Sequence, residues 1–229
     1  MTAAAPAVSR TRKSAGAILI FAAVTFWLAW LFMPDAGTND AARIQEVVRE
    51  HRGSVFLSLI VQIISSVAFV PAVLLIARLP LAQAQRRVFV GGALLLIGAM
   101  GMCADAIFHL AAYSMTADGV AAENMHRSMM LLQTEGIRFL LPLLLSFLIG
   151  GIVLALGLQH AGLASPGPVM VFASAIATAG VGGITAAAMD AGRYAVVLLF
   201  LGLFALALVW LGVELMRPQQ KPKLKPKRR

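Results

Sequence analysis

The chain has 229 residues, of which 60% are hydrophobic and only 13% charged, and its formal net charge is +9. This composition excludes a water-soluble globular domain, because soluble monomers expose only small contiguous apolar patches. The chain is therefore predicted to lie largely in a lipid bilayer as one domain. Its single cysteine, Cys103, excludes an intramolecular disulfide, a Cys-x-x-Cys redox pair and a thiolate zinc cluster.

Six apolar segments are long enough to cross a bilayer as helices, because about 20 helical residues span its hydrocarbon core. The segments lack the alternation of apolar and polar residues that membrane strands need. The sequence thus predicts an all-α, polytopic bundle of six transmembrane helices, with the first helix retained as an anchor rather than cleaved as a signal peptide. The predicted spans are residues 15–33, 55–76, 88–110, 139–158, 168–189 and 194–215.

The basic residues predict the orientation of these spans, since lysine and arginine next to a span resist translocation. With six spans, 13 of the 19 basic residues fall on one side, and nine of the ten acidic residues fall on or near the other. The basic side is assigned to the cytoplasm of a bacterial inner membrane, with both termini inside. The predicted organisation is a cytoplasmic N-terminus at 1–14, a membrane domain at 15–215 and a basic, disordered tail at 216–229.

Small residues predict where helices pack closely, because lipid gives helices no hydrophobic reason to associate. In the fifth span, Ala175 and Ala179 begin a four-residue repeat of small residues that continues at 183 and 187, so this helix is predicted to be central. The third span, with Gly91, Gly92, Gly98 and Gly101, is predicted to be a second closely packed helix.

Two outer loops are long enough to hold structure. In the first, the stretch Thr38-Asn39-Asp40 offers an N-cap, and Gly53 is expected to end the helix. The apolar face of this helix is formed by Ala41, Ile44, Val47 and Val48. It is predicted to lie on the outer membrane surface. The second loop, residues 114–138, is expected to continue into the fourth span as one long helix.

Four ionisable residues at the outer side form the candidate chemical site. Asp105 and His109 are one helical turn apart near the outer end of the third span, and Glu123 and His126 are similarly spaced in the following loop. Two imidazoles and two carboxylates can bind a divalent metal, and the nearby methionines and Cys103 would instead suit Cu(I). No cofactor is predicted outright, because compact metal signatures are missing. The same four residues could serve a membrane enzyme acting on lipid or quinone, although no nucleophile motif accompanies them, so an enzyme is the less favoured reading.

The C-terminal tail is the most basic local feature of the chain. Its prolines and mutually repelling charges favour an extended, disordered segment that touches anionic lipid or docks an acidic protein. Direct nucleic-acid binding is not expected, since no aromatic residue interleaves the charges. The candidate partner-binding residues are Lys221, Lys223, Lys225, Lys227, Arg228 and Arg229.

The segment LFMPDAGTNDAARI at residues 31–44, followed by Gln62 and by FVPA at residues 69–72, resembles a pattern of small six-span bacterial inner-membrane proteins. In size, span count and short cytoplasmic ends the chain also resembles the membrane anti-sigma factor that controls light-induced carotenoid synthesis. That resemblance implies a protein that holds a sigma factor at the membrane and releases it on a signal.

Three functions remain open from the sequence. The favoured one is a regulator that receives a signal in its bundle and sequesters a cytoplasmic partner such as a sigma factor. The second is a small transporter or metal-handling protein, possible as a homo-oligomer because six helices enclose little space. The third is the membrane enzyme acting on lipid or quinone.

Overall fold

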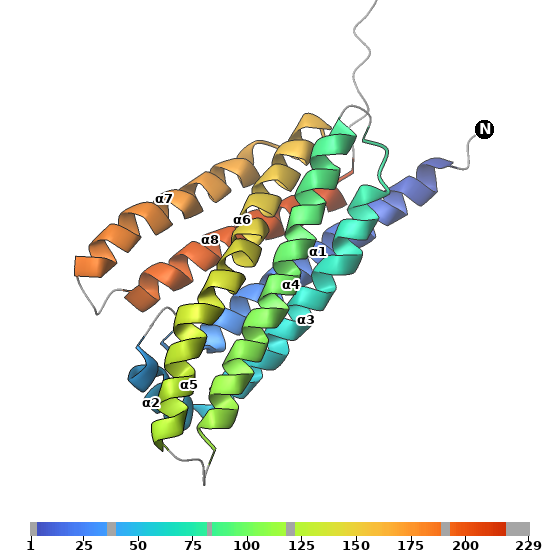
Figure 1. Ribbon diagram of the computed structural model, residues 1–229. Coiled ribbons are helices and arrows are strands. Elements are labelled where there is room, and N and C mark those ends of the chain that lie inside the picture. The colour runs from blue at the N-terminus through green and yellow to red at the C-terminus, as the bar shows by residue number, and fades with distance from the viewer. Residues whose placement is uncertain (1–3, 36–39, 82–83, 118–121, 189–192, 219–229) are drawn as a thin grey trace, which may run out of the picture.

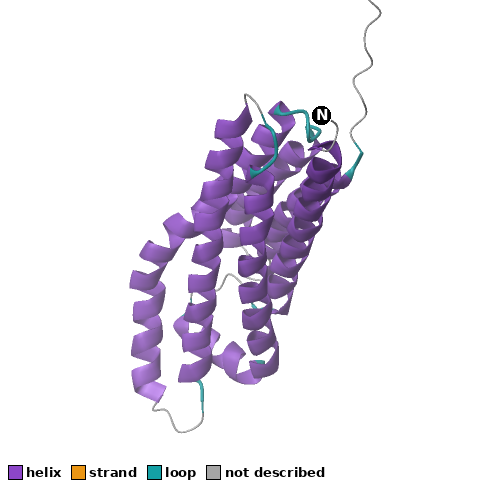
Figure 2. Ribbon diagram, turned by 90° about the vertical axis from the view of Figure 1, so that its right-hand side faces the viewer, coloured by secondary structure: helices purple, strands orange, loops and turns teal. Residues whose placement is uncertain are grey.

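The computed structural model describes residues 4–35, 40–81, 84–117, 122–188 and 193–218. It confirms the all-helical prediction, because 90% of the described residues lie in helices and none of them in a strand. The long helices lie side by side in one bundle (Figures 1 and 2). Their bounds are α1 Ala4–Phe32, α2 Ala41–Glu50, α3 Arg52–Ala77, α4 Gln85–Met115, α5 Ala122–Leu131, the π-helical turn η2 Leu132–Gly136, α6 Ile137–His160, α7 Gly167–Ala188 and α8 Arg193–Met216.

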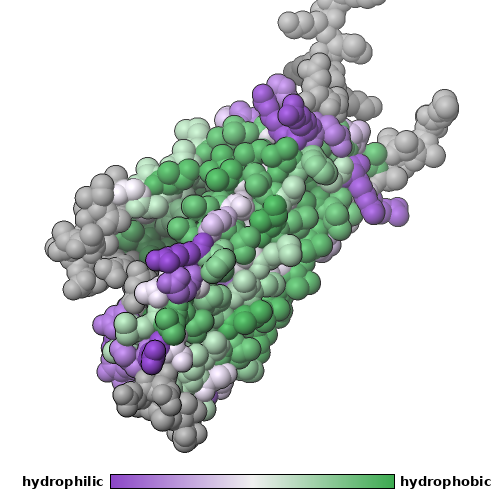
Figure 3. Space-filling view, in the orientation of Figure 1, coloured by the Kyte–Doolittle hydropathy of each residue, from purple (hydrophilic) through white to green (hydrophobic). Residues whose placement is uncertain are grey.

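Five helical segments of the described chain are long and apolar enough to cross a membrane. They are Val8–Phe32, Arg52–Ala77, Gln85–Met115, Met125–His160 and Tyr194–Met216. The remaining predicted span, the fifth at residues 168–189, coincides with α7, in which the stretch Gly167–Gly180 is apolar but shorter. In Figure 3 much of the side of the bundle is hydrophobic, and hydrophilic residues lie at its ends and in one group on the side between them. The chain is therefore compatible with a multi-pass membrane protein, while the span at α7 and the orientation remain predictions.

The helices pack in the order α6, α4, α3, α1, α8 and α7, each mainly against its neighbours in this series. The two members at the ends of the series, α6 and α7, touch each other only slightly. The helices therefore form an arc rather than a fully closed ring. Aromatic and aliphatic side chains fill the concave side of the arc, and that core is the framework for the site described below.

The prediction that the fifth span is central was wrong, because α7 lies at one edge of the bundle and packs mainly on α8 (Figure 1). Ala175 is buried there, but Ala179 and Gly180 on the same helix are exposed. Small residues permit a close helix contact without specifying that one forms, and this helix packs closely on one neighbour only.

The prediction of close packing at the third span is confirmed. A Cβ atom added at Gly91 of α4 would overlap the backbone of Leu154 in α6, and one added at Gly98 would overlap the backbone of Phe147. The reverse holds for α6, where a Cβ at Gly150 would overlap the backbone of Leu95. Glycines on both helices thus let the two backbones approach closely along several turns.

Polar contacts tie the helices together at both ends. At the end that carries α2, called the α2 end, Arg52 of α3 stacks on the Tyr113 ring, 4.0 Å from its centroid, and donates to Thr116 Oγ1 at 2.9 Å. At the opposite end, the Arg12 guanidinium of α1 donates to the carbonyl oxygen of Arg217, just after α8. The helix-terminus carbonyl has no partner inside its own helix, so Arg12 fixes α1 against the end of α8.

Glu214 anchors the start of α7 to α8 at the same opposite end. Its carboxylate accepts hydrogen bonds from the Ser165 backbone N–H at 3.0 Å, the Ser165 hydroxyl at 2.7 Å and Trp210 Nε1 at 3.0 Å. The contact explains how α7, at the edge of the bundle, is held without a central position. The predicted cytoplasmic residues Arg12, Glu214 and Arg217 therefore lie together at one end of the bundle.

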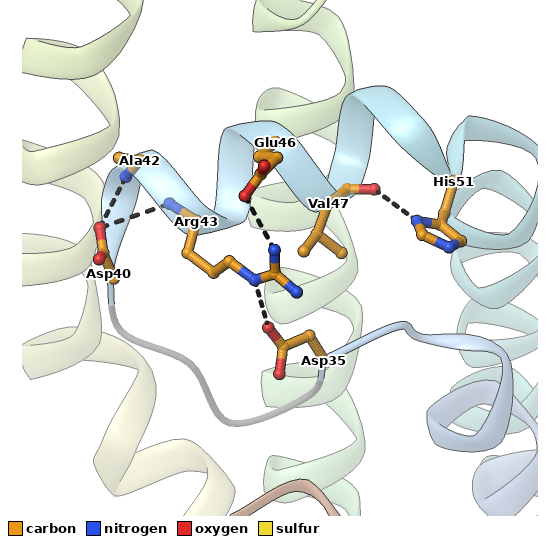
Figure 4. A network of polar contacts seen from close by, with 7 residues as sticks. All are labelled: Asp35, Asp40, Ala42, Arg43, Glu46, Val47 and His51. Atoms are coloured by element: carbon orange, nitrogen blue, oxygen red, sulfur yellow. Dashed lines mark hydrogen bonds and ion pairs between the residues drawn. The ribbon is translucent and has the colours of Figure 1, made fainter. Parts of the chain in front are cut away.

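The first outer loop forms the predicted amphipathic helix, α2, with Asp40 as its N-cap. The Asp40 side chain accepts hydrogen bonds from the backbone N–H groups of Ala42 and Arg43 (Figure 4). The expected end at Gly53 was wrong, because α2 ends at Glu50, His51 caps it, and α3 begins at Arg52. His51 has a non-helical backbone conformation, with φ −118° and ψ 34°, which redirects the chain two residues before the glycine.

The second outer loop continues into the fourth span as predicted, since α5, η2 and α6 follow one another without a break. The π-helical turn between them marks the junction. Such turns insert an extra residue into a helix and are found disproportionately at functional sites. In this chain η2 contributes to a cavity.

Candidate functional site

A cavity of about 400 Å³ lies inside the arc toward the α2 end. Its walls come from α1, α4, α6 and α8, and α2, α5 and η2 close it at the α2 end. Most of its lining is apolar, and aromatic rings are prominent in it: Phe26, Trp30, Phe108, Phe147 and Phe200. An apolar, concave site of this volume with a few polar groups has the features of a small-molecule site.

The polar wall of the cavity is built around Asp105 of α4. Asp105 is buried, and its Oδ2 atom accepts a hydrogen bond of 2.7 Å from Gln62 Nε2 of α3. The His109 ring lies one turn further along α4, with Nδ1 3.7 Å from the same Oδ2 atom. This separation is too long for a hydrogen bond, so the imidazole lies beside the carboxylate without being tied to it.

Asp105 lies deeper in the bundle than its sequence position suggested. The predicted span ended at residue 110, but α4 continues to Met115, which places Asp105 about 15 Å from that end of the helix. Gln62, its partner, is a similar distance from the start of α3. Gln62 therefore lies near the middle of α3 and Asp105 in the second half of α4, and a carboxylate buried within such an apolar helix calls for a functional hypothesis.

Trp30 of α1 adds a second polar group to the cavity. Its ring stands edge-on to the His109 ring, with the centroids 6.2 Å apart and the planes at 85°. Among the described residues, neither Trp30 Nε1 nor His109 Nδ1 has a hydrogen-bond partner, although both atoms are buried. Buried polar atoms are almost always paired, so two unpaired nitrogens at one cavity indicate that a partner is missing from it.

Aromatic rings form the floor of the cavity. Phe26 and Phe147 line it, and their ring centroids are 5.2 Å apart. Phe147 also contacts Phe69 at 5.1 Å and Phe204 at 5.2 Å, and Phe204 contacts Phe172 of α7 at 4.9 Å. These five rings, here called the aromatic cluster, connect the cavity floor with α3, α7 and α8. A shift of the Phe147 ring would therefore change side-chain packing on several helices at once.

The α2 helix closes one end of the cavity. Ile44, Val47 and Val48 face the bundle and line the cavity, so protein rather than solvent covers the apolar face of α2. On its outer face, Arg43 bonds Glu46 at 2.8 Å and Asp35 at 3.0 Å (Figure 4). Hydrogen bonds from Glu46 and then Asp35 raise the pKa of the Arg43 guanidinium. Exposed ion pairs contribute little to stability, so burial of the valines is what holds α2 in place.

Replacing Asp40 with alanine should loosen this closure. Loss of an N-cap costs about 1 kcal/mol, so α2 should exchange its backbone amide hydrogens several times faster while the long helices keep their rates. Hydrogen exchange on the purified protein, resolved for peptides within residues 41–50, measures the effect. Glu50→Ala at the other end of α2 is the matched control, and equal acceleration in both variants would contradict a capping role for Asp40.

The structure brings together only part of the predicted four-residue site. Asp105 and His109 lie side by side, whereas His126 is exposed on α5. The side chain of Glu123 lies outside the described residues, as do the predicted partner-binding residues Lys221, Lys223, Lys225, Lys227, Arg228 and Arg229. In the part of the chain that the structure describes, no three histidine, cysteine or acidic side chains gather in a way that could hold a metal ion.

Two residues of the site were missed by sequence reasoning. Gln62 lies within the predicted second span, but the sequence does not show that its partner is Asp105 on another helix. The sequence does not indicate a binding role for Trp30, because tryptophans near span ends are common in membrane proteins. Its role follows only from the packing of α1 against α4.

Comparisons with known proteins identify no relative. No family model matches the chain, and neither the curated proteins nor the solved structures include a match.

Proposed function

We propose that the protein is a six-span inner-membrane regulator, with both termini in the cytoplasm, whose cavity receives a small lipophilic signal. The observation that carries the proposal is the cavity of about 400 Å³, with a buried acid and a half-buried imidazole in its wall and two buried nitrogen atoms without a described partner. A cavity with these features is suited to binding. The basic cytoplasmic end then holds a soluble partner, such as a sigma factor, in a manner that depends on whether the cavity is occupied.

The aromatic cluster supports a connection between the two ends. Phe26 and Phe147 touch the cavity, and Phe204 and Phe172 belong to the helices that Glu214 joins at the opposite end. A ligand that displaces Phe147 has a packed route to α7 and α8. The regulatory effect requires the ligand to bind one arrangement of this cluster more tightly than another.

Recovery of a soluble partner tests the regulator directly. Membranes from cells that express the full chain should retain a cytoplasmic protein that co-purifies after detergent extraction. Deletion of residues 221–229 should reduce this retention, because it removes six basic side chains. If no soluble protein is recovered, or if the deletion leaves retention unchanged, the tail has no such role and the proposed output is wrong.

The proposed orientation has its own test. In a Cys103→Ser background, a cysteine at Glu50 should react with a membrane-impermeant maleimide added to intact spheroplasts, and a cysteine at Gln159 should react only after the membrane is opened. Glu50 belongs to α2, and Gln159 lies at the opposite end of α6. The reverse pattern would contradict the assigned orientation, and labelling of both sites in intact spheroplasts would contradict the membrane topology.

A membrane enzyme is the second candidate, and the proximity of His109 to Asp105 is the observation that favours it. An imidazole beside a carboxylate can act as a general base when a substrate reaches it. The regulator is preferred because, in the described cavity lining, no serine, threonine or cysteine stands beside this pair as a nucleophile. A change in a defined membrane lipid or quinone in His109→Ala cells, at normal protein level, would favour the enzyme instead.

A further inference from the structure

We infer that the cavity ligand is a neutral lipophilic molecule with a carbonyl-type oxygen, which accepts a hydrogen bond from Trp30 Nε1. The inference rests on the proposed function for the cavity and adds the chemical class of its ligand. The inference follows from three features of the cavity: the unpaired Trp30 Nε1 donor, the carboxylates that already have protein partners, and the volume of the cavity.

Trp30 requires an acceptor rather than a donor. An indole N–H can only donate a hydrogen bond, and in the described structure Trp30 Nε1 is buried without a partner. Leaving a buried donor unpaired costs free energy, which a ligand oxygen would recover on binding. His109 Nδ1 is also buried and unpaired, and its ring lies against Trp30, so a ligand oxygen beside the indole would have a second polar group within the same wall.

The polar wall disfavours a cationic ligand. Two carboxylates line the cavity, and each is already engaged by a protein group. Asp105 accepts a hydrogen bond from the Gln62 amide at 2.7 Å and has the His109 ring beside it, and Asp35 accepts one from Arg43 at 3.0 Å. The rest of the lining is mainly aliphatic and aromatic. Moving a charged group into such surroundings from water or from the lipid headgroup region costs free energy. A neutral ligand places its apolar part against these walls and needs only one hydrogen-bonding group.

The volume limits the ligand to a ring or a short chain. At about 400 Å³ the cavity is near the lower end of the range for small-molecule sites, too small for a complete phospholipid. Both α6 and α8 line the cavity, but each packs mainly against other helices. A longer alkyl tail would therefore leave the cavity between α6 and α8, where the wall has the least helix packing, and extend into lipid.

Binding of defined probes to the full-length protein in nanodiscs tests this ligand class. The tritiated probe is a benzoquinone with a decyl chain. The unlabelled competitors are decanoyl glycerol, which offers an ester carbonyl, decylbenzene, which has no oxygen, and decyltrimethylammonium, which is a cation. Competition by the ester as well as the quinone would assign the site to lipid-derived carbonyls generally, whereas competition by the quinone alone would assign it to a ring carbonyl; either result supports the inferred class.

The expected result is that decylbenzene and decyltrimethylammonium compete at least tenfold more weakly than the unlabelled quinone. This comparison uses the unaltered chain, so it does not depend on how a variant folds. Equal competition by decylbenzene, or stronger competition by the cation, would overturn the carbonyl class.

Trp30→Phe should weaken binding of the quinone about five- to tenfold, the effect of losing one hydrogen bond, and leave competition by decylbenzene unchanged. Trp27→Phe is the matched control, because Trp27 lies on the same helix but outside the cavity lining. An unchanged affinity in Trp30→Phe would overturn the assignment of the donor.

A cavity-filling variant separates failure of the ligand class from failure of the site. Val197→Trp fills the cavity from α8, while Leu199→Trp places the same ring on the exposed side of that helix. If Val197→Trp abolishes binding but decylbenzene competes as well as the quinone, the site stands and the ligand class is wrong. If binding persists in Val197→Trp, the cavity is not the site and the proposed function loses its basis.

Discussion

Replacing Gly98 with alanine should destabilise the protein by about 1–3 kcal/mol or more, the usual cost of overpacking. The added methyl group would overlap the backbone and Cβ of Phe147, and backbone cannot move aside as a flexible side chain can. The α4 and α6 helices must therefore separate. Because Phe147 belongs to the aromatic cluster, the separation should disturb the cavity floor as well.

Equilibrium unfolding of the detergent-solubilised protein measures this effect, with helical circular dichroism as the signal. Gly180→Ala is the matched control, since a Cβ at Gly180 of α7 has no described neighbour within 4 Å. Alanine also favours helix over glycine, so the control should be neutral or slightly stabilising. If Gly98→Ala is as stable as Gly180→Ala, the close α4–α6 approach described above is wrong.

The second large effect is expected at the Gln62–Asp105 pair. Gln62→Leu leaves the buried Asp105 carboxylate without its amide donor, and Asp105→Leu leaves the Gln62 amide without its acceptor. Each change should cost about 1–3 kcal/mol, because an unsatisfied buried group loses its solvation without a replacement. The double variant should cost clearly less than the sum, since it leaves neither group unpaired.

A double-mutant cycle on unfolding free energies gives the coupling directly. We expect a coupling of about 1–2 kcal/mol, at the upper part of the range seen for hydrogen bonds in membrane proteins. The pair Ser58 and Asp105 provides a control, because Ser58 bonds the carbonyl of Ala29 rather than Asp105. Additive effects for Gln62 and Asp105 would mean that the two side chains do not pair.

The long apolar helices and α2 could be predicted from the sequence because they depend on local information. The length of an apolar helix follows from composition and the rise per residue, and α2 follows from the polar cap residues before it and the spacing of its valines. The contact between α4 and α6 could be predicted only in part. The glycines of α4 indicated that some helix packs closely against it, but no local feature of the sequence identified α6 as that helix.

The cavity could not be predicted, because it depends on which helix faces which. Asp105 and His109 were singled out from their spacing on one helix, yet Gln62 lies 43 positions earlier in the chain and Trp30 earlier still. The predicted third span ended at residue 110, whereas α4 continues to Met115, so the sequence did not show how far Asp105 lies from the end of its helix. The repeat of small residues in α7 led to the wrong prediction of a central helix for a related reason. The repeat describes one surface of α7 and does not show which helix, if any, packs against that surface.

The most direct test of the central claim is the identity of the molecules that co-purify with the protein. The unaltered chain, Val197→Trp and Leu199→Trp should be purified in parallel from native membranes, extracted with organic solvent and compared by mass spectrometry. The account predicts a neutral, oxygen-containing lipophilic molecule enriched with the unaltered chain and with Leu199→Trp, and depleted with Val197→Trp. Equal recovery of every lipophilic molecule from all three proteins would show that the cavity does not hold a ligand.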